Sequence, residues 1–226
     1  MNLPTMPRAL QTNDASHSND INDGTDPRGP RLILGSTSVY RRELLSRLRF
    51  PFEVVAPHVD ETPLPGEAPI ALAERLALSK AKAVAAQFPD SVVIGSDQVA
   101  DLHGQCLGKP GTHSNAAAQL RQMRGQTVIF QTAVAVVCFK TGFEQRSLAS
   151  VSVKFRDLTD AEIENYLTIE KPYDCAGSAK SEGLGIALLD AIDSDDPTAL
   201  IGLPLIRTCQ MLRAAGLELL MPKATA

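Results

Sequence analysis

Apolar residues follow two alternating patterns from residue 31 to about residue 216. Short, uninterrupted apolar runs bounded by glycine or polar residues predict buried strands, and apolar residues recurring every three or four positions predict amphipathic helices. The predicted strands lie at 31–35, 52–56, 92–94 (leading into 95–98), 127–139 and 146–156, with a hairpin over 99–107. The predicted helices lie at about 38–48, 69–87, 114–124, 159–169 and 204–215.

Several residues mark the ends of these elements. Pro69 suits the first turn of a helix, Gly125 suits the position after a helix, and Thr159 with Glu162 forms a capping box. The two long strands within 127–156 are joined by a polar turn and predict an antiparallel pair. Short strands and glycine turns are expected over 174–192. Alternating strands and helices with one long hairpin indicate an α/β protein with a mixed sheet.

Composition excludes several classes of protein. The 226 residues are 44% hydrophobic and 21% charged, which is typical of a globular protein, and the net charge of -4 argues against a general nucleic-acid binder. No apolar run reaches the roughly 20 residues of a membrane span. Residues 1–30 are polar and predict a disordered extension, 31–220 a single domain, and 221–226 a flexible tail. The cysteines form no Cys-x-x-Cys pair, which favours a reducing cytoplasm.

The loop after the first predicted strand carries the first candidate site. Ser36 and its small neighbours precede a helix with Arg41 and Arg42 in its first turn. Cations there oppose the helix dipole unless an anion is bound, and free N–H groups, hydroxyls and guanidinium groups together form a phosphate cradle. The alternative is a capped turn with two solvated arginines.

Acidic residues form further candidates. Asp60 and Glu61 are adjacent in a loop and can hold Mg²⁺ through one or two oxygens, although such pairs are usually just solvated. Asp97 follows an apolar strand and suits a metal ligand or a base, or else a turn or capping aspartate. Asp193, Asp195 and Asp196 form an acidic loop that is expected to be solvated.

Cationic and glycine-rich segments complete the set. Lys80 lies on the long predicted helix, and Lys109 stands between glycine and proline, where it can serve a phosphate as a point charge or be an ordinary turn residue. Glu182 lies in a Lys-Ser-Glu-Gly segment whose glycines permit close approach of a ligand, and which could instead be a turn between strands. Cations, carboxylates and a candidate base together describe a nucleotide polyphosphate site, without a P-loop or a Gly-x-Ser-x-Gly elbow.

Seven motifs in order resemble one family. They are STSVYRR (36–42), VDE (59–61), ALSKA (77–81), GSDQ (95–98), GKP (108–110), CAGS (175–178) and GLP (202–204). Over about 31–216 the chain is similar to the Maf-like nucleoside triphosphate pyrophosphatases. This resemblance implies an elongated, ITPase-like α/β fold, with a mixed sheet flanked by helices and a central cleft. It also implies a homodimer. Val39 stands where the family usually has proline, which would pre-set the loop.

The resemblance is strongest to the 7-methyl-GTP branch, because of Tyr40, Gln98 and Glu182. An aromatic face and a carboxylate can attract a positively charged methylated purine. The alternatives are a dTTP or UTP pyrophosphatase, a house-cleaning enzyme acting on several damaged nucleotides, or a nucleotide-binding regulator linked to cell division.

The resemblance assigns a role to each candidate residue. Asp97 is the expected base, and Asp60 or Glu61 with Asp97 is expected to bind Mg²⁺ or Mn²⁺. The residues expected to hold the phosphates are Ser36, Arg41, Arg42, Lys80 and Lys109.

Overall fold

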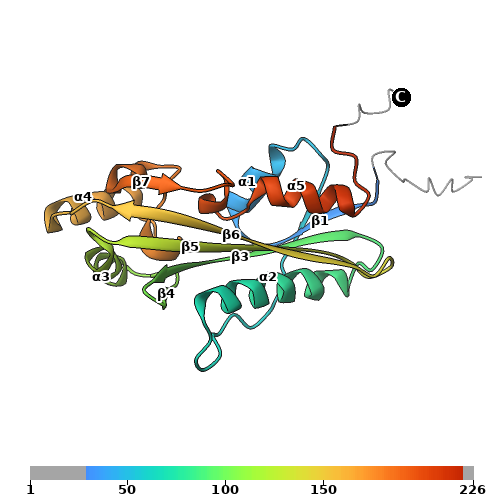
Figure 1. Ribbon diagram of the computed structural model, residues 1–226, viewed down its shortest axis with the longest axis horizontal. Helices are drawn as coiled ribbons and strands as arrows, with labels where there is room; N and C mark the ends of the chain where they lie inside the picture. Colours follow the sequence, from blue (N-terminus) through green and yellow to red (C-terminus); the bar gives the residue numbers. More distant parts are fainter. Residues whose placement is uncertain (1–28, 221–226) are drawn as a thin grey trace, which may run out of the picture.

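A long, twisted mixed sheet runs through the molecule, with helices on both of its faces (Figure 1). The structure is a computed structural model that describes residues 29–220. The predicted disordered extension up to residue 28 and the predicted tail at 221–226 lie outside the described residues.

The helices and strands agree closely with the pattern of the sequence. The helices are α1 (Val39–Ser46), α2 (Pro69–Ala85), α3 (His113–Met123), α4 (Asp160–Glu170) and α5 (Leu205–Ala214). The strands are β1 (Leu32–Gly35), β2 (Glu53–Val55), β3 (Val92–Leu102), β4 (Gln105–Leu107), β5 (Thr127–Cys138), β6 (Phe143–Phe155) and β7 (Leu189–Asp193). Within residues 29–220, no helix has both the length and the apolar character needed to cross a bilayer.

The sheet has the strand order β2–β1–β3–β5–β6–β7, and β4 pairs with β3 off this path. Strand β1 is parallel to β2 and β3, and the remaining pairs are antiparallel. The predicted antiparallel pair is confirmed: Thr127 of β5 lies opposite Lys154, and Cys138 lies opposite Phe143. The predicted α/β class with a mixed sheet is therefore confirmed.

The core lies on both faces of this sheet because successive residues of a strand point to opposite sides. Val92 and Ile94 of β3 pack into the cluster that includes Leu44 of α1 and Leu212 of α5. Val93 packs into the opposite cluster with α2. A third cluster joins α3 and α4 to the far ends of β5 and β6, and Figure 1 shows these two helices at the end of the sheet away from α5.

Helix α2 lies unusually close to β3 at Gly95. A Cβ atom at this position would lie 2.2 Å from the backbone oxygen of Ala77 and 2.5 Å from the backbone nitrogen of Ala81. Only glycine permits this approach, because real Cβ atoms do not come so near to backbone atoms. Residues 95 and 97 point to the same face of the strand, so Asp97 also faces α2.

Two expectations for the C-terminal third were only partly confirmed. Where several short strands were expected, the chain forms the 3-10 helices η1 (Ala176–Ser178) and η2 (Leu184–Leu188) and a single strand, β7. Gly177 adopts a φ of 66°, and Lys180 and Leu184 donate hydrogen bonds to side chains of α4. In the acidic loop, Asp193 and Asp195 are exposed as expected, whereas Asp196 is fully buried. Its carboxylate accepts a hydrogen bond from the backbone N–H of Arg207 in the first turn of α5, where a negative charge stabilises the helix.

The close contact at Gly95 can be tested by substitution. Gly95→Ala is expected to lower the free energy of unfolding by about 1–3 kcal/mol, because the new methyl group would overlap the backbone of α2. Gly108→Ala is the matched control, since a Cβ atom at Gly108 meets nothing within 4 Å, and it should stay within about 0.5 kcal/mol of the wild type. Urea denaturation measures both, and equal stability of the two variants would contradict the contact.

Candidate active site

A cavity of about 530 Å³, called the central cleft below, contains most of the candidate residues. It is lined by the loop before α1 and the start of α1, by α2, and by β3 where that strand passes Gly95. The loops that follow β2, β4 and α4 and the 3-10 helix η3 (Ala199–Ile201) complete its walls. The cleft therefore joins segments that lie far apart in the sequence.

A lysine holds two carboxylates together inside the cleft. Lys80 Nζ of α2 lies 2.7 Å from Asp97 Oδ1 of β3 and 3.0 Å from Glu61 Oε1. The side chains of Lys80 and Asp97 are only 6% and 10% exposed, whereas that of Glu61 is 54% exposed. A buried pair of this kind is stable only while both partners are present. In the sequence these three residues belong to separate candidate clusters, and the fold brings them together into one group.

Arg41 adds a second cation to this group. Its Nε donates to the backbone oxygen of Gly202 at 2.8 Å, which orients the guanidinium group in the cleft. Burial lowers the pKa of Arg41, although the charges of Asp97 and Glu61 act in the opposite direction. Ser38 caps α1, because its side chain accepts from the backbone N–H of Arg41.

Three candidate residues do not line the cleft. The Ser36 hydroxyl is buried and accepts from the backbone N–H of Ser38 at 3.1 Å. Arg42 is exposed outside the cleft. Asp60 Oδ1 accepts from the backbone N–H of Thr62, and hydrogen bonds from the side chain and then the backbone of Thr62 lower the pKa of Asp60. Lys109 does line the cleft and is exposed at its rim.

Thr37 and Ser38 line the cleft and were missed as site residues. Ser38 had a detectable signal, since serine just before a helix is a preferred N-cap.

Tyr40 lies at another part of the cleft, beside the loop after α4. Its hydroxyl group is 3.5 Å from Asp174 Oδ1 and 3.8 Å from Cys175 Sγ. Burial raises the pKa of Tyr40 and raises that of Cys175 to about 12, so both groups are protonated at neutral pH. The Lys180 ammonium group lies 5.7 Å from the centre of the Tyr40 ring. One face of this ring is therefore already covered by a cation.

Gln98 lines the cleft next to Asp97 but faces η3. Its amide nitrogen lies 2.9–3.0 Å from the hydroxyl of Thr132 and from the backbone oxygens of Ala199 and Leu200. Three acceptors around one atom fix it as the amide nitrogen rather than the oxygen. The donors of the amide are thus used by the protein, and its carbonyl oxygen remains to accept a hydrogen bond from a ligand.

The segment that presents Glu182 is fastened to α4. Glu170 accepts from Lys180 Nζ through Oε1 and from the Leu184 backbone N–H through Oε2, both at 2.8 Å. Tyr166 accepts from the Lys180 backbone N–H at 3.0 Å. Glu182 is exposed at the rim, yet enough protein surrounds its carboxylate to raise its pKa. These contacts hold both sides of Glu182 in place.

Residues 31–215 match the family described as Maf-like protein. The chain belongs to the Maf-like protein family. The resemblance inferred from the seven motifs is therefore confirmed, and it covers the cleft and every residue described above.

Proteins called 7-methyl-GTP pyrophosphatase are among the most similar relatives of this Maf-like chain. One from Polaromonas is 75% identical over 193 residues, which are 85% of this chain and 88% of that protein. One from Albidiferax ferrireducens is 70% identical over 196 residues, which are 87% of this chain and 98% of that protein. The solved structure of the Staphylococcus aureus Ham1 protein matches with a TM-score of 0.42 and 14% identity, over 56% of this chain and 72% of that one, which is too distant to add to the assignment.

The fastening of the 180–184 segment predicts a pH dependence. Hydrogen bonds from Lys180 and Leu184 hold the pKa of Glu170 below its ordinary value of 4.5. A carboxyl group of this kind stabilises the fold above its unfolded pKa and loses that contribution as the pH falls through its folded pKa. The difference in unfolding free energy between wild type and Glu170→Gln should be constant near pH 7 and shrink below about pH 4.5.

Denaturation by urea at a series of pH values between 7 and 3 measures this difference. The control is Glu43→Gln, because Glu43 is exposed and its carboxylate has no partner within residues 29–220. A Glu170→Gln difference that stays constant down to pH 3 would show that the carboxylate does not fasten the segment.

Proposed function

We propose that this protein is a nucleotide pyrophosphatase that converts 7-methyl-GTP to the monophosphate and pyrophosphate. The observation that carries the proposal is the group formed by Lys80, Asp97 and Glu61 beside Arg41 in one cleft. Hydrolysis of a phosphoanhydride bond requires cations next to carboxylates. The cations bind the phosphate oxygens, and a carboxylate orients the attacking water and accepts its proton. The names of the relatives support the same activity and substrate.

In this proposal the cations bind the triphosphate. Arg41, with one edge used by Gly202, presents its remaining N–H groups to phosphate oxygens. Lys80 and Lys109 act as point charges from two sides of the cleft. Asp97 orients a water molecule and accepts its proton. The water oxygen attacks the α-phosphorus, the bond from that phosphorus to the bridging oxygen breaks, and pyrophosphate leaves.

The carboxylates of the cleft fit a divalent cation, Mg²⁺ or Mn²⁺. Glu61 and Asp97 both lie within 3.0 Å of Lys80 Nζ, so a triphosphate bound there would face two negative charges. Mg²⁺ is usually held by one or two carboxylates together with substrate phosphates. Within residues 29–220, no group of three or more His, Cys, Asp or Glu side chains forms a metal site. When bound, the cation would neutralise phosphate charge and acidify its bound water.

The other part of the cleft is proposed to select the base. Gln98 offers one acceptor, its carbonyl oxygen, and the Glu182 carboxylate offers another. The Gln98 oxygen can accept from the N–H donors on one edge of guanine, while the Glu182 carboxylate would lie beside the opposite edge, where a methyl group on N7 places a positive charge. Tyr40 and the negative charge of Glu182 would also attract a positively charged methylated ring. The homodimer and the cytoplasmic location stay predictions.

Asp97→Asn tests the reaction. It is expected to lower kcat for pyrophosphate release from 7-methyl-GTP by about 100- to 10,000-fold, because the amide cannot accept a proton from water. The assay compares 7-methyl-GTP, GTP, dTTP, UTP and CTP with Mg²⁺ or Mn²⁺. A thermal melt of the variant separates lost chemistry from lost folding. Wild-type preference for dTTP or UTP would refute the proposed substrate, and full activity of the variant would refute the role of Asp97.

Glu61 and Asp60 give a matched pair for the metal. Glu61 lines the cleft and Asp60 does not, although they are adjacent and both exposed. Glu61→Gln should raise the Mg²⁺ concentration for half-maximal rate by about tenfold or more, and Asp60→Asn should leave it unchanged. Titration of initial rates with Mg²⁺ measures both values. The opposite order of the two variants would assign the metal to Asp60.

A further inference from the structure

A second cavity of about 310 Å³, called the side pocket below, adjoins the central cleft. It is lined by Val151 of β6 and by residues of the segments 181–186 and 192–201. Glu182, Leu200 and Ile201 line both cavities. These three residues therefore form the boundary between the side pocket and the cleft, and the side pocket adjoins the part of the cleft that contains Glu182.

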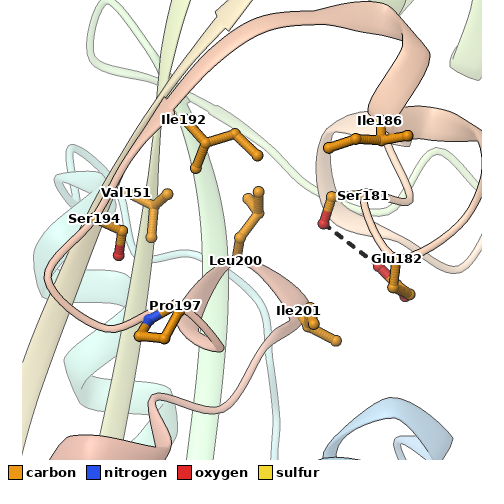
Figure 2. Close-up of a pocket in the computed structure, with 9 residues that line it drawn as sticks. All are labelled: Val151, Ser181, Glu182, Ile186, Ile192, Ser194, Pro197, Leu200 and Ile201. Atoms are coloured by element: carbon orange, nitrogen blue, oxygen red, sulfur yellow. Dashed lines mark hydrogen bonds between the residues drawn. The ribbon is translucent and has the colours of Figure 1, made fainter.

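The walls of the side pocket are mostly apolar. Figure 2 shows Leu200 directed into the middle of the space, with Ile186 and Ile192 on one side and Glu182 and Ile201 at another. Ile186 and Ile192 are 53% and 43% exposed. Large aliphatic side chains that remain exposed around a concave surface gain free energy when an apolar group covers them.

The hydroxyl groups in the side pocket already have partners. Ser194 Oγ donates to the backbone oxygen of Asp196 at 2.9 Å and accepts from its N–H at 3.1 Å. Ser181 Oγ donates to the Glu182 carboxylate at 3.5 Å (Figure 2). With these groups used by the protein, the pocket suits an apolar ligand better than a polar one.

The side pocket is much larger than a methyl group. A methyl group occupies about 30 Å³, similar to the share of one water molecule in the liquid, which is about a tenth of the side pocket. A purine with a substituent on N7 carries a positive charge, and this charge is attracted to Glu182 at the boundary between the cavities. A substituent on that side of the ring would extend past Glu182 toward Leu200 and Ile192.

We infer that the side pocket receives an apolar group attached to the base, so that the substrates include guanine nucleotides whose N7 carries an alkyl or aryl group larger than methyl. This inference rests on the proposed function, because it takes the base to lie against Glu182. It extends that function from one methylated nucleotide to a class of alkylated nucleotides that share a positive ring and an apolar substituent.

The test compares 7-methyl-GTP with 7-benzyl-GTP. The wild type should hydrolyse both, with kcat/KM values within about fivefold of each other, because the benzyl group enters an existing space. Ile192→Trp fills the side pocket from β7. It should lower kcat/KM for 7-benzyl-GTP by at least about tenfold and change that for 7-methyl-GTP by less than about twofold.

Ile186→Trp fills the same pocket from η2 and should give the same selective loss, which covers the case in which one variant folds poorly. The matched control is Ile206→Trp, because Ile206 of α5 is 47% exposed and lines neither cavity. It should leave both substrates unaffected.

Each other result overturns the inference. Hydrolysis of 7-methyl-GTP without hydrolysis of 7-benzyl-GTP refutes the side-pocket role and leaves the proposed function intact. Hydrolysis of neither substrate by the wild type refutes both. If Ile192→Trp and Ile186→Trp lower kcat/KM equally for both substrates, the pocket shapes the base site without receiving a substituent. A changed molar mass of these variants in light scattering, with unchanged selectivity, means that a second copy of the chain covers the pocket.

Discussion

The contact between the backbone of α2 and Gly95 determines where the polar group of the cleft is formed. The absence of a side chain at Gly95 lets α2 lie directly on β3. Lys80 lies within the contacting turn of α2, between Ala77 and Ala81, and Asp97 is the next residue of β3 on the same face. Their 2.7 Å ion pair is a consequence of this packing. A larger residue at position 95 would separate the helix from the strand and the lysine from the carboxylate.

Burial gives this ion pair its significance. Two charges removed from water are costly, and their attraction compensates only when the geometry is good. Here Lys80 also reaches Glu61, and the Arg41 guanidinium group is held nearby by the backbone oxygen of Gly202. The fold thus maintains cations and carboxylates side by side in a cleft before any ligand arrives. Electrostatic preorganisation of this kind is the basis of much enzymatic rate enhancement.

The part of the cleft around Tyr40 and Glu182 is organised differently. Its walls include 3-10 helices and loops that pack on several elements: η1 on α3 and β3, η2 on α4, and η3 on β5 and β6. Glu170 fixes the segment through two hydrogen bonds, and η3 fixes the Gln98 amide through its backbone oxygens. In the proposed function, backbone groups of these irregular segments fix the side chains that a base would meet, and the same segments form the side pocket.

The sequence by itself determined the strands, the helices, the mixed sheet and the order of the motifs. Local patterns suffice for these features, because apolar periodicity, caps and prolines act over a few residues. The tertiary structure decided which polar residues meet. Glu61 and Asp60 are adjacent and chemically alike, yet only Glu61 reaches Lys80. Asp196 lies in an acidic run but is buried, because its carboxylate accepts a hydrogen bond from the backbone N–H of Arg207 at the start of α5. These partners come from segments far away in the sequence, so local sequence patterns cannot predict which residues meet.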